Sequence, residues 1–201
     1  MYPVRYYADY LERPDRWRTG FRFILIIPWY IVQQIYSYLI LVTALIAWVV
    51  LVFTAKYPNW LYDFNAGYLR FNSRVTAFFL LQTDAWPSFG FDQPGYPTRL
   101  LIEQPPQRFS RWKVFFRFIL AIPAAVIASL MLMLAAFASI ISWLAIVFTG
   151  RQPKGVHNVL ALGIGYTMRA HAYAYLLLTD AYPPVSDQEV AEPESAEPPP
   201  A

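Results

Sequence analysis

Few residues in this chain could carry acid–base or metal chemistry. The only histidines are His157 and His171, and no acidic residue lies near either of them in the sequence. The chain has no cysteine, which excludes disulfides, thiolate nucleophiles and cysteine metal ligands. His-Glu-x-x-His, Gly-x-Ser-x-Gly and Walker-type sequences are absent as well. We therefore expect a non-enzyme with no catalytic residue, metal site or cofactor, and we interpret Gly163 and Gly165 as a helix-packing feature.

Three arginines in weakly charged segments are the next candidates. Arg70, Arg74 and Arg169 would face an anion if the chain formed part of a transport pathway, because charges inside membrane segments are costly and often functional. Four helices would enclose such a pathway only as an oligomer. One hypothesis is therefore an oligomeric transporter or channel subunit for an anionic solute or lipid.

The composition predicts a membrane protein. Hydrophobic residues make up 57% of the chain and charged residues 14%, whereas soluble proteins carry about 25% charged residues. Residues 186–201 are acidic, proline-rich and free of aromatics, and we expect them to be disordered. The remainder is basic, which favours anionic lipid headgroups over nucleic acid as a partner. A protein partner or a second copy of the chain is also compatible with this composition.

One apolar stretch occurs twice. Phe21–Pro28 returns as Phe116–Pro123, each time with one arginine and one proline. This repeat predicts two tandem units, residues 1–95 and 96–185, in an all-α integral membrane fold. In each unit we expect a short extended segment, then a long kinked transmembrane helix, then an amphipathic or second membrane helix.

The length of the apolar runs predicts the kinks. The run from Phe21 to Phe53 would be roughly 50 Å long as a straight helix, and a bilayer core is about 30 Å thick. We therefore expect an interfacial lead-in, a kink at Pro28 and one tilted span, with the same at Pro123 in the second unit. Ala121, Ala125 and Ser129 predict a small-residue packing face in the second span. Gly150 is placed to end that helix.

The segments flanking these runs suggest extended structure and membrane anchors. Residues 2–10 and 96–103 alternate partly in strand-like fashion and could pair as a ribbon outside the membrane. Basic and tryptophan side chains then cluster at the start of each apolar run, a pattern typical of headgroup anchors whose long side chains extend outward. The candidate anchors are Arg16, Trp17, Arg22, Arg111, Trp112 and Arg117.

Two aspartates close the repeats. Asp84 and Asp180 each stand in a Thr-Asp sequence shortly before a proline. The simpler interpretation, which we favour, is a helix exit with the aspartate in a turn. The alternative pairs Asp84 and Asp180 with arginines of the anchor segments, Arg16 for example, and so joins each repeat's end to its beginning.

The second helix of each unit bears on the number of membrane crossings. In the first unit, the helix around Phe71 is amphipathic and its arginines disfavour insertion, so it lies on the interface or packs against partners. Its counterpart, residues 156–178, could span. If each unit crosses twice, both anchor segments share one face with most of the basic residues, which favours cytoplasmic termini. The alternative is one crossing per unit, which would make the repeats inverted.

These motifs together resemble a known family. The Tyr-Pro-x-Arg openings, the Ile-Pro early in each apolar run, the Phe-Thr-Gly-Arg-x-Pro stop at residues 148–153 and the Thr-Asp-x-Tyr-Pro-Pro close at 179–184 are similar to the bacterial membrane family called domain of unknown function 4389. The first stop departs from the pattern, with Ala55 and Lys56 in place of Gly and Arg. The resemblance implies a bacterial inner-membrane protein and carries no established activity. Of the possible functions we favour a structural, accessory or interaction module.

Overall fold

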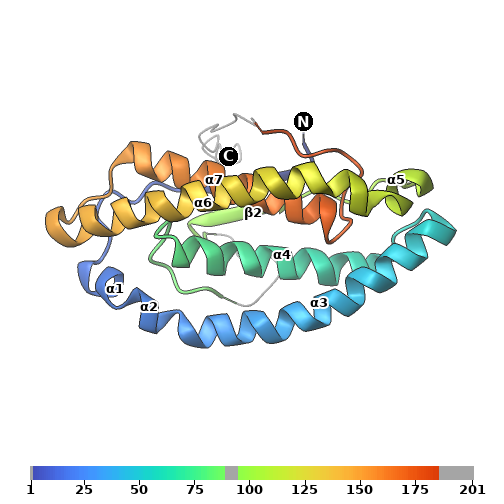
Figure 1. Cartoon of the computed structure of the whole chain (residues 1–201). Coiled ribbons are helices and arrows are strands. Elements are labelled where there is room, and N and C mark those ends of the chain that lie inside the picture. The colour runs from blue at the N-terminus through green and yellow to red at the C-terminus, as the bar shows by residue number, and fades with distance from the viewer. Residues whose placement is uncertain (1, 89–94, 186–201) are drawn as a thin grey trace, which may run out of the picture.

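The computed structural model describes residues 2–88 and 95–185. Its elements are β1 (Val4–Ala8), α1 (Arg16–Gly20), α2 (Arg22–Leu25), α3 (Ile27–Thr54), α4 (Asn59–Phe79), β2 (Thr98–Ile102), α5 (Arg111–Phe115), α6 (Arg117–Thr149) and α7 (Lys154–Ala174) (Figure 1). The predicted acidic tail lies outside the described residues.

The repeat seen in the sequence is a repeat of helix hairpins. A long helix, α3 or α6, is followed by a shorter one, α4 or α7, which packs back along it. Both long helices end in a left-handed residue, Ala55 at φ 57° and Gly150 at φ 72°. The prediction that Gly150 ends its helix is confirmed.

The two predicted kinks turn out differently. In the first unit the helix is interrupted at Ile26, so that α2 is separate and Pro28 lies in the first turn of α3. In the second unit α6 continues through Pro123, so the chain has no break there, and the kink at Pro123 stays a prediction. Proline inside a helix removes a backbone donor and crowds the carbonyl four residues earlier. Ala121 and Ala124, which flank it, are buried on the contact face, and this packing offsets the cost of the proline.

Each long helix touches the rest of the protein along one narrow stripe. The buried residues of α3 are Ile40, Ala44, Ala47 and Leu51, spaced three to four apart. On α6 the stripe consists of small residues, among them Ala135 and Ser142. The predicted packing face is therefore wrong beyond Ala121, because Ala125 and Ser129 are exposed. The remaining circumference of both helices lies on the outside of the protein.

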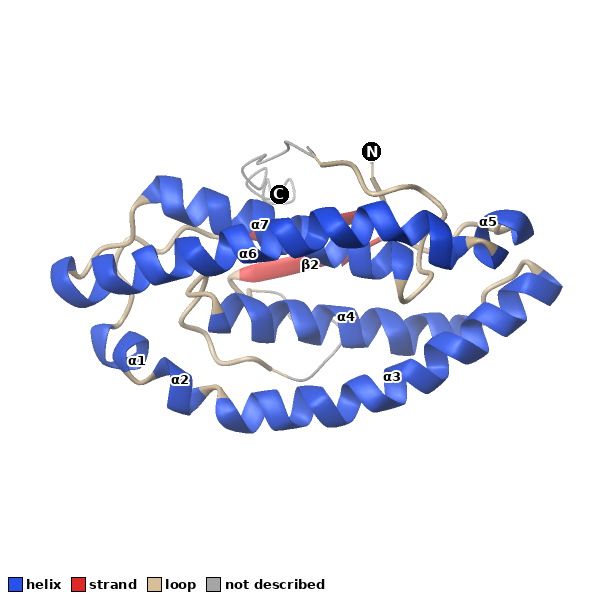
Figure 2. Ribbon diagram, in the orientation of Figure 1, coloured by secondary structure: helices blue, strands red, loops and turns tan. Residues whose placement is uncertain are grey.

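The two extended segments pair, which the sequence had left open. Strands β1 and β2 form an antiparallel two-stranded ribbon, with Tyr6 opposite Leu100 (Figure 2). Because side chains alternate along a strand, one face of the ribbon carries Val4, Tyr6 and Leu100, of which Val4 and Leu100 are buried. The other face carries Arg5, Tyr7, Arg99 and Leu101 and is partly open.

The two units exchange their opening segments. Strand β1 packs on α7 and β2 packs on α4, while α1 packs on α6 and α5 on α3. The indole nitrogen of Trp48 donates to the Val114 carbonyl at 3.1 Å, and Trp143 donates to the Thr19 carbonyl at 3.1 Å. Each unit is thus completed by the start of the other.

This exchange fixes the direction of the long helices. Helix α1, at the start of α3, lies near the end of α6, and α5, at the start of α6, lies near the end of α3. Helices α3 and α6 are therefore antiparallel (Figure 1). The expectation that both anchor segments share one end of the helices is wrong, because they lie at opposite ends.

Helices α4 and α7 form the middle of the molecule. Helix α4 contacts α3, α7 and β2, and α7 contacts α6, α4 and β1. Most of their residues are buried, including Leu69 and Phe71 on α4 and Leu160 and Ile164 on α7. The order of layers is therefore ribbon, then α4 and α7, then α3 and α6.

Candidate functional site

The outer surface of α3 and α6 is the most extensive feature of the molecule. No formal charge occurs between Arg22 and Lys56 or between Arg117 and Arg151. Both helices are long and apolar enough to cross a membrane. The large apolar side chains exposed on them are Ile27, Tyr30, Ile31, Ile35, Tyr38, Leu39, Leu41, Val42, Leu45, Ile46, Val49, Phe53, Phe118, Ile119, Leu120, Ile122, Val126, Leu130, Leu132, Met133, Leu134, Phe137, Ile140, Ile141, Leu144 and Phe148.

Four of the predicted anchor residues lie at the ends of this surface. Trp17 is 77% exposed and Trp112 is 75% exposed. Arg16 and Arg111, beside them in the short helices α1 and α5, are exposed too. Both side chains are therefore accessible from outside the protein. The guanidinium of Arg16 lies against Gly150, where an added Cβ would be 2.5 Å from its Nη2 atom.

Arg22 and Arg117 occupy a different environment from the one predicted. Only 2% of Arg22 and 1% of Arg117 is exposed, so neither side chain extends outward. Arg22 forms an ion pair with Asp84, and Arg117 with Asp180 at 2.5 Å. The physical reason is that the last residues of each unit return to the start of the same unit. They bring an aspartate carboxylate beside the buried arginine.

Each buried arginine is held by a matching set of contacts. Arg22 donates to the carbonyl oxygens of Phe78 and Thr83 and lies 4.4 Å from the Phe78 ring centroid. Arg117 donates to the Thr179 carbonyl at 3.2 Å and lies 4.2 Å from the Tyr173 ring centroid. Carbonyl oxygens and an aromatic face replace the water that a buried guanidinium loses.

The aspartates extend these contacts to the opening segments. The Asp84 carboxylate accepts a hydrogen bond from the backbone N–H of Asp15 at 2.7 Å, and the Asp180 carboxylate accepts one from the backbone N–H of Ser110 at 2.7 Å. The Thr83 hydroxyl accepts the backbone N–H of Ala85 and shapes the turn. The aspartates thus pair with arginines of the opening segments, which was the less favoured of the two interpretations, and the partners are Arg22 and Arg117 rather than Arg16. We call these two groups of contacts the arginine clamps.

The arginines considered for transport lie in the middle layer. Arg74 is buried, donates to the Ser88 carbonyl at 3.0 Å and lies 5.4 Å from the Tyr96 ring centroid. Arg169, its counterpart on α7, is also buried, and Arg70 is half-buried. Helix α4 thus packs against partners that surround its arginines, which was one of the two expectations for it.

The two histidines are separated. His157, at the start of α7, is buried beside Gln82 and its ring meets the Tyr10 ring edge-on at 5.2 Å. Burial lowers the pKa of His157, opposed by the Ala8 carbonyl and by Asp9. His171 is exposed near the other end of α7. In residues 2–88 and 95–185, no group of three or more His, Cys, Asp or Glu side chains is placed to hold a metal ion.

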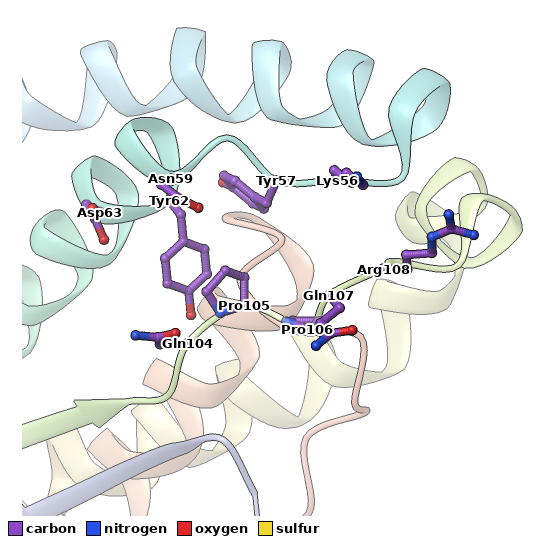
Figure 3. Close-up of a pocket in the computed structure, with 10 residues that line it drawn as sticks. All are labelled: Lys56, Tyr57, Asn59, Tyr62, Asp63, Gln104, Pro105, Pro106, Gln107 and Arg108. Carbon is purple, nitrogen blue, oxygen red and sulfur yellow. The ribbon is translucent and has the colours of Figure 1, made fainter.

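A polar cleft opens where α3 turns into α4 (Figure 3). Its volume is about 660 Å³. It is lined by Lys56, Tyr57, Asn59, Tyr62, Asp63, Gln104, Pro105, Pro106, Gln107 and Arg108. Two cations and one carboxylate give it a slight positive balance, suited to a small anionic group.

The cleft has a sequence origin that motif reading missed. At the start of α7 the Tyr10 ring contacts His157 and lies 5.4 Å from the Lys154 ammonium. Tyr10 follows Asp9 in the first repeat, and Gln104 follows the matching Glu103 in the second, ninety-four positions later. An amide side chain is smaller than a phenol ring and leaves space there. Comparing the repeats position by position would have revealed this difference.

Comparisons with known proteins give one finding. The family model described as Domain of unknown function (DUF4389) matches residues 16–90 and again residues 111–186. The two matches begin at α1 and α5, so each corresponds to one helix-hairpin unit together with its short opening helices. No match was found among curated proteins or among solved structures.

Proposed function

Since this chain belongs to the DUF4389 family, with two copies in tandem, we propose that it is a structural or interaction module held in the bacterial inner membrane by α3 and α6. One observation supports this most strongly, namely the uncharged, exposed apolar surface of the two long helices. Soluble monomers rarely expose contiguous apolar patches of more than a few hundred Å². Two helices exposed over most of their circumference exceed that limit.

The ends of the apolar surface support contact with lipid headgroups. Trp17 and Trp112 are exposed there, and tryptophan collects at membrane–water interfaces. The exposed basic residues near the same ends are Arg16, Arg18, Lys56, Arg111, Lys113 and Arg151. Each basic residue near an anionic surface contributes about 1 kcal/mol to binding. Anionic lipid is therefore the preferred partner in this proposal.

The proposal requires no catalytic group. Arg22 and Arg117 pair with aspartates, and His157 is engaged with Gln82 and Tyr10. These polar groups act in folding, and the outer surface acts in binding. The transport alternative needs Arg70, Arg74 and Arg169 to face a pathway. The contacts of Arg74 with Ser88 and Tyr96 weigh against it.

Flotation with lipid vesicles tests the proposal. The purified chain, diluted out of detergent, should float with vesicles that contain anionic lipid. Leu134→Lys, on the exposed side of α6, should reduce the floated fraction at least several-fold, because a charge in the hydrocarbon costs about 2.5–3.5 kcal/mol at its centre. Leu101→Lys, on the exposed face of the ribbon, is the matched control and should float like the parent.

Two outcomes would contradict the proposal. A parent chain that stays monodisperse in the aqueous phase without detergent would remove the membrane role. Anion flux into proteoliposomes that is lost in Arg74→Gln and Arg169→Gln variants would favour the transport alternative instead.

A further inference from the structure

We propose that the chain lies in the plane of the membrane, with α3 and α6 embedded in one leaflet and the β1–β2 ribbon facing water, rather than crossing the bilayer. This inference rests on the proposed function and identifies its partner as the acyl layer of a single leaflet. It follows from the path of the chain between the two long helices.

The antiparallel arrangement of α3 and α6 demands a connection along the full length of the molecule. Helix α4 returns from the end of α3 to its beginning, and α6 starts near the end of α3, where α5 meets Trp48. The chain between α4 and α5 therefore travels back along the helices. Strand β2 is part of that connection, and Figure 1 shows it lying along α4.

The contacts of the ribbon trace this path at both ends of the middle helices. Near the start of α4 the Tyr62 hydroxyl donates to the Glu103 carbonyl, and beyond its end the Tyr96 hydroxyl donates to the Ala85 carbonyl at 3.0 Å. Strand β1 does the same along α7. The Ala8 carbonyl lies 3.4 Å from a ring nitrogen of His157, and beyond the end of α7 the Tyr2 hydroxyl donates to the Ala181 carbonyl. The two extended segments thus run along α4 and α7 from the start of each helix to beyond its end.

A spanning orientation would therefore carry the ribbon through the hydrocarbon. Its open face holds two cross-strand ion pairs, Arg5 with Glu103 at 3.3 Å and Arg99 with Asp9 at 3.5 Å, all with exposed side-chain surface. Each charge would cost about 2.5–3.5 kcal/mol at the bilayer centre. A two-stranded ribbon also leaves one edge of each strand without a strand partner, and open sheet edges do not occur in lipid.

An in-plane orientation places the apolar surface of α3 and α6 in hydrocarbon and the charged ribbon in water. The exposed side chains in the middle of α3 and α6 are uncharged and mostly apolar, with Gln34 and Ser129 as polar exceptions. The charged face of the ribbon lies beyond α4 and α7. A helix with its side chains is about 10–12 Å across. One leaflet offers about 15 Å of hydrocarbon, half of the roughly 30 Å core. A single layer of helices therefore fits one leaflet, as in amphipathic interfacial proteins.

Cysteine labelling tests the orientation directly, because the parent chain has no cysteine. Lys56→Cys and Arg151→Cys follow corresponding helices and lie at opposite ends of the molecule, so they form a matched pair. Arg99→Cys reports on the ribbon. With a membrane-impermeant maleimide, applied to spheroplasts and to inverted vesicles, all three should be labelled from the same side. Labelling of Lys56→Cys and Arg151→Cys from opposite sides would overturn the inference.

Depth measurements provide an independent readout. Spin labels at Ile31, Leu39 and Phe53, all exposed along α3, should report one common depth of about 5–10 Å below the headgroups. A crossing helix would place Leu39 much deeper than the other two, and that result would contradict the inference. Failure of the parent chain to float with vesicles would instead remove the proposed function, so the two failures are distinguishable.

Discussion

The arginine clamps are the residues on which both units depend most. Arg22 and Arg117 carry a formal charge at positions that are nearly inaccessible to water. A charge in such a place is tolerated only with a close counter-charge and satisfied hydrogen bonds. Asp84 and Asp180 supply the counter-charge and also accept an N–H from the opening segment. In each unit one carboxylate, located after the shorter helix, thus binds both the arginine and the backbone of the segment that precedes the long helix.

Removing one member of a clamp should therefore destabilise the protein strongly. Arg117→Met leaves Asp180 without its cation, and we expect a loss of roughly 3 kcal/mol in the free energy of unfolding. Arg99→Met, in an exposed ion pair with Asp9, is the matched control and should cost at most about 1 kcal/mol. Denaturant unfolding in detergent, followed by tryptophan fluorescence, measures both. Equal small losses would show that the clamp does not hold the unit together.

His157 should make stability depend on pH. Burial lowers its pKa below the value of 6.5 for an exposed histidine, so the unfolded state binds the proton more readily. The contribution to stability is complete above about pH 6.5 and is lost as the pH falls below it. The loss is at most about 1.4 kcal/mol per pH unit. Asp9, the nearest carboxylate, opposes the shift without reversing it.

The comparison of His157→Asn with the parent chain tests this. The fall in melting temperature between pH 7.5 and pH 5.5 should be smaller in the variant, because one of the groups that takes up a proton on unfolding is gone. Identical pH dependence in both proteins would mean that His157 is protonated equally in the folded and unfolded states.

At the residue level, the sequence showed which arginines could pair with Asp84 but not which of them does. Arg16 and Arg22 stand six positions apart at the start of the same apolar run, and either could meet Asp84 or a headgroup. Which one is buried depends on where α4 ends, far along the chain. For this reason the prediction that the Arg22 side chain extends outward is wrong. Arg16, the first residue of α1, remains exposed.

The two hairpins pack by different means. Helices α3 and α4 meet through large aromatic side chains, with the Tyr36 ring 5.1 Å from the Tyr68 ring. Helices α6 and α7 meet through small residues, where Gly163 lies against Ala135 and the Met131 carbonyl. On the far side of α7, Gly165 lies against Tyr6 of β1. The two glycines thus let α7 fit between α6 and the ribbon, as their interpretation as a packing feature predicted.

A substitution at Gly163 should weaken the packing between α6 and α7. An added Cβ would lie 2.7 Å from the Met131 carbonyl oxygen and 2.7 Å from the Ala135 Cβ atom, so Gly163→Ala must shift one of the helices. We expect a loss of about 1–3 kcal/mol in the free energy of unfolding. Gly155→Ala, in the first turn of the same helix, meets no atom within 4 Å. This control should gain up to about 1 kcal/mol from helix propensity.

Element-level prediction from sequence succeeded where the signal was local. The ribbon, the long helices and the left-handed stop at Gly150 follow from alternation, apolar length and glycine placement. The packing face through Ala125 and Ser129 is wrong because tertiary contacts decide which side of the helix is buried. The buried positions are Ala121 and Ala124 near the start of α6 and Ala135, Ala138, Ser142 and Ile146 along its second half.

The exchange of opening segments governs the whole molecule and is invisible in the sequence. Two tandem copies of one motif suggest two parallel units, each closed on itself. The sequence suggested the pairing of β1 with β2, but not that each strand lies on the other unit's helix. Side chains reinforce the exchange: the Tyr57 hydroxyl donates to the Leu176 carbonyl at 3.0 Å, and the Gln152 amide donates to the Leu81 carbonyl at 2.9 Å. Only long-range contacts specify this arrangement.

Neither unit should therefore fold without the other. Fragments 1–90 and 91–201, each expressed alone, lack a partner for their strand, and an isolated strand has no ribbon to form. Expressed together, they should associate through the same exchanged contacts. An affinity tag on the first fragment should then recover the second in equal amount from detergent extracts. Trp143→Ala in the second fragment should reduce that recovery, since it removes the indole donor to Thr19. Stable, monodisperse behaviour of either fragment alone would show that a unit closes on itself and that the exchanged contacts are dispensable.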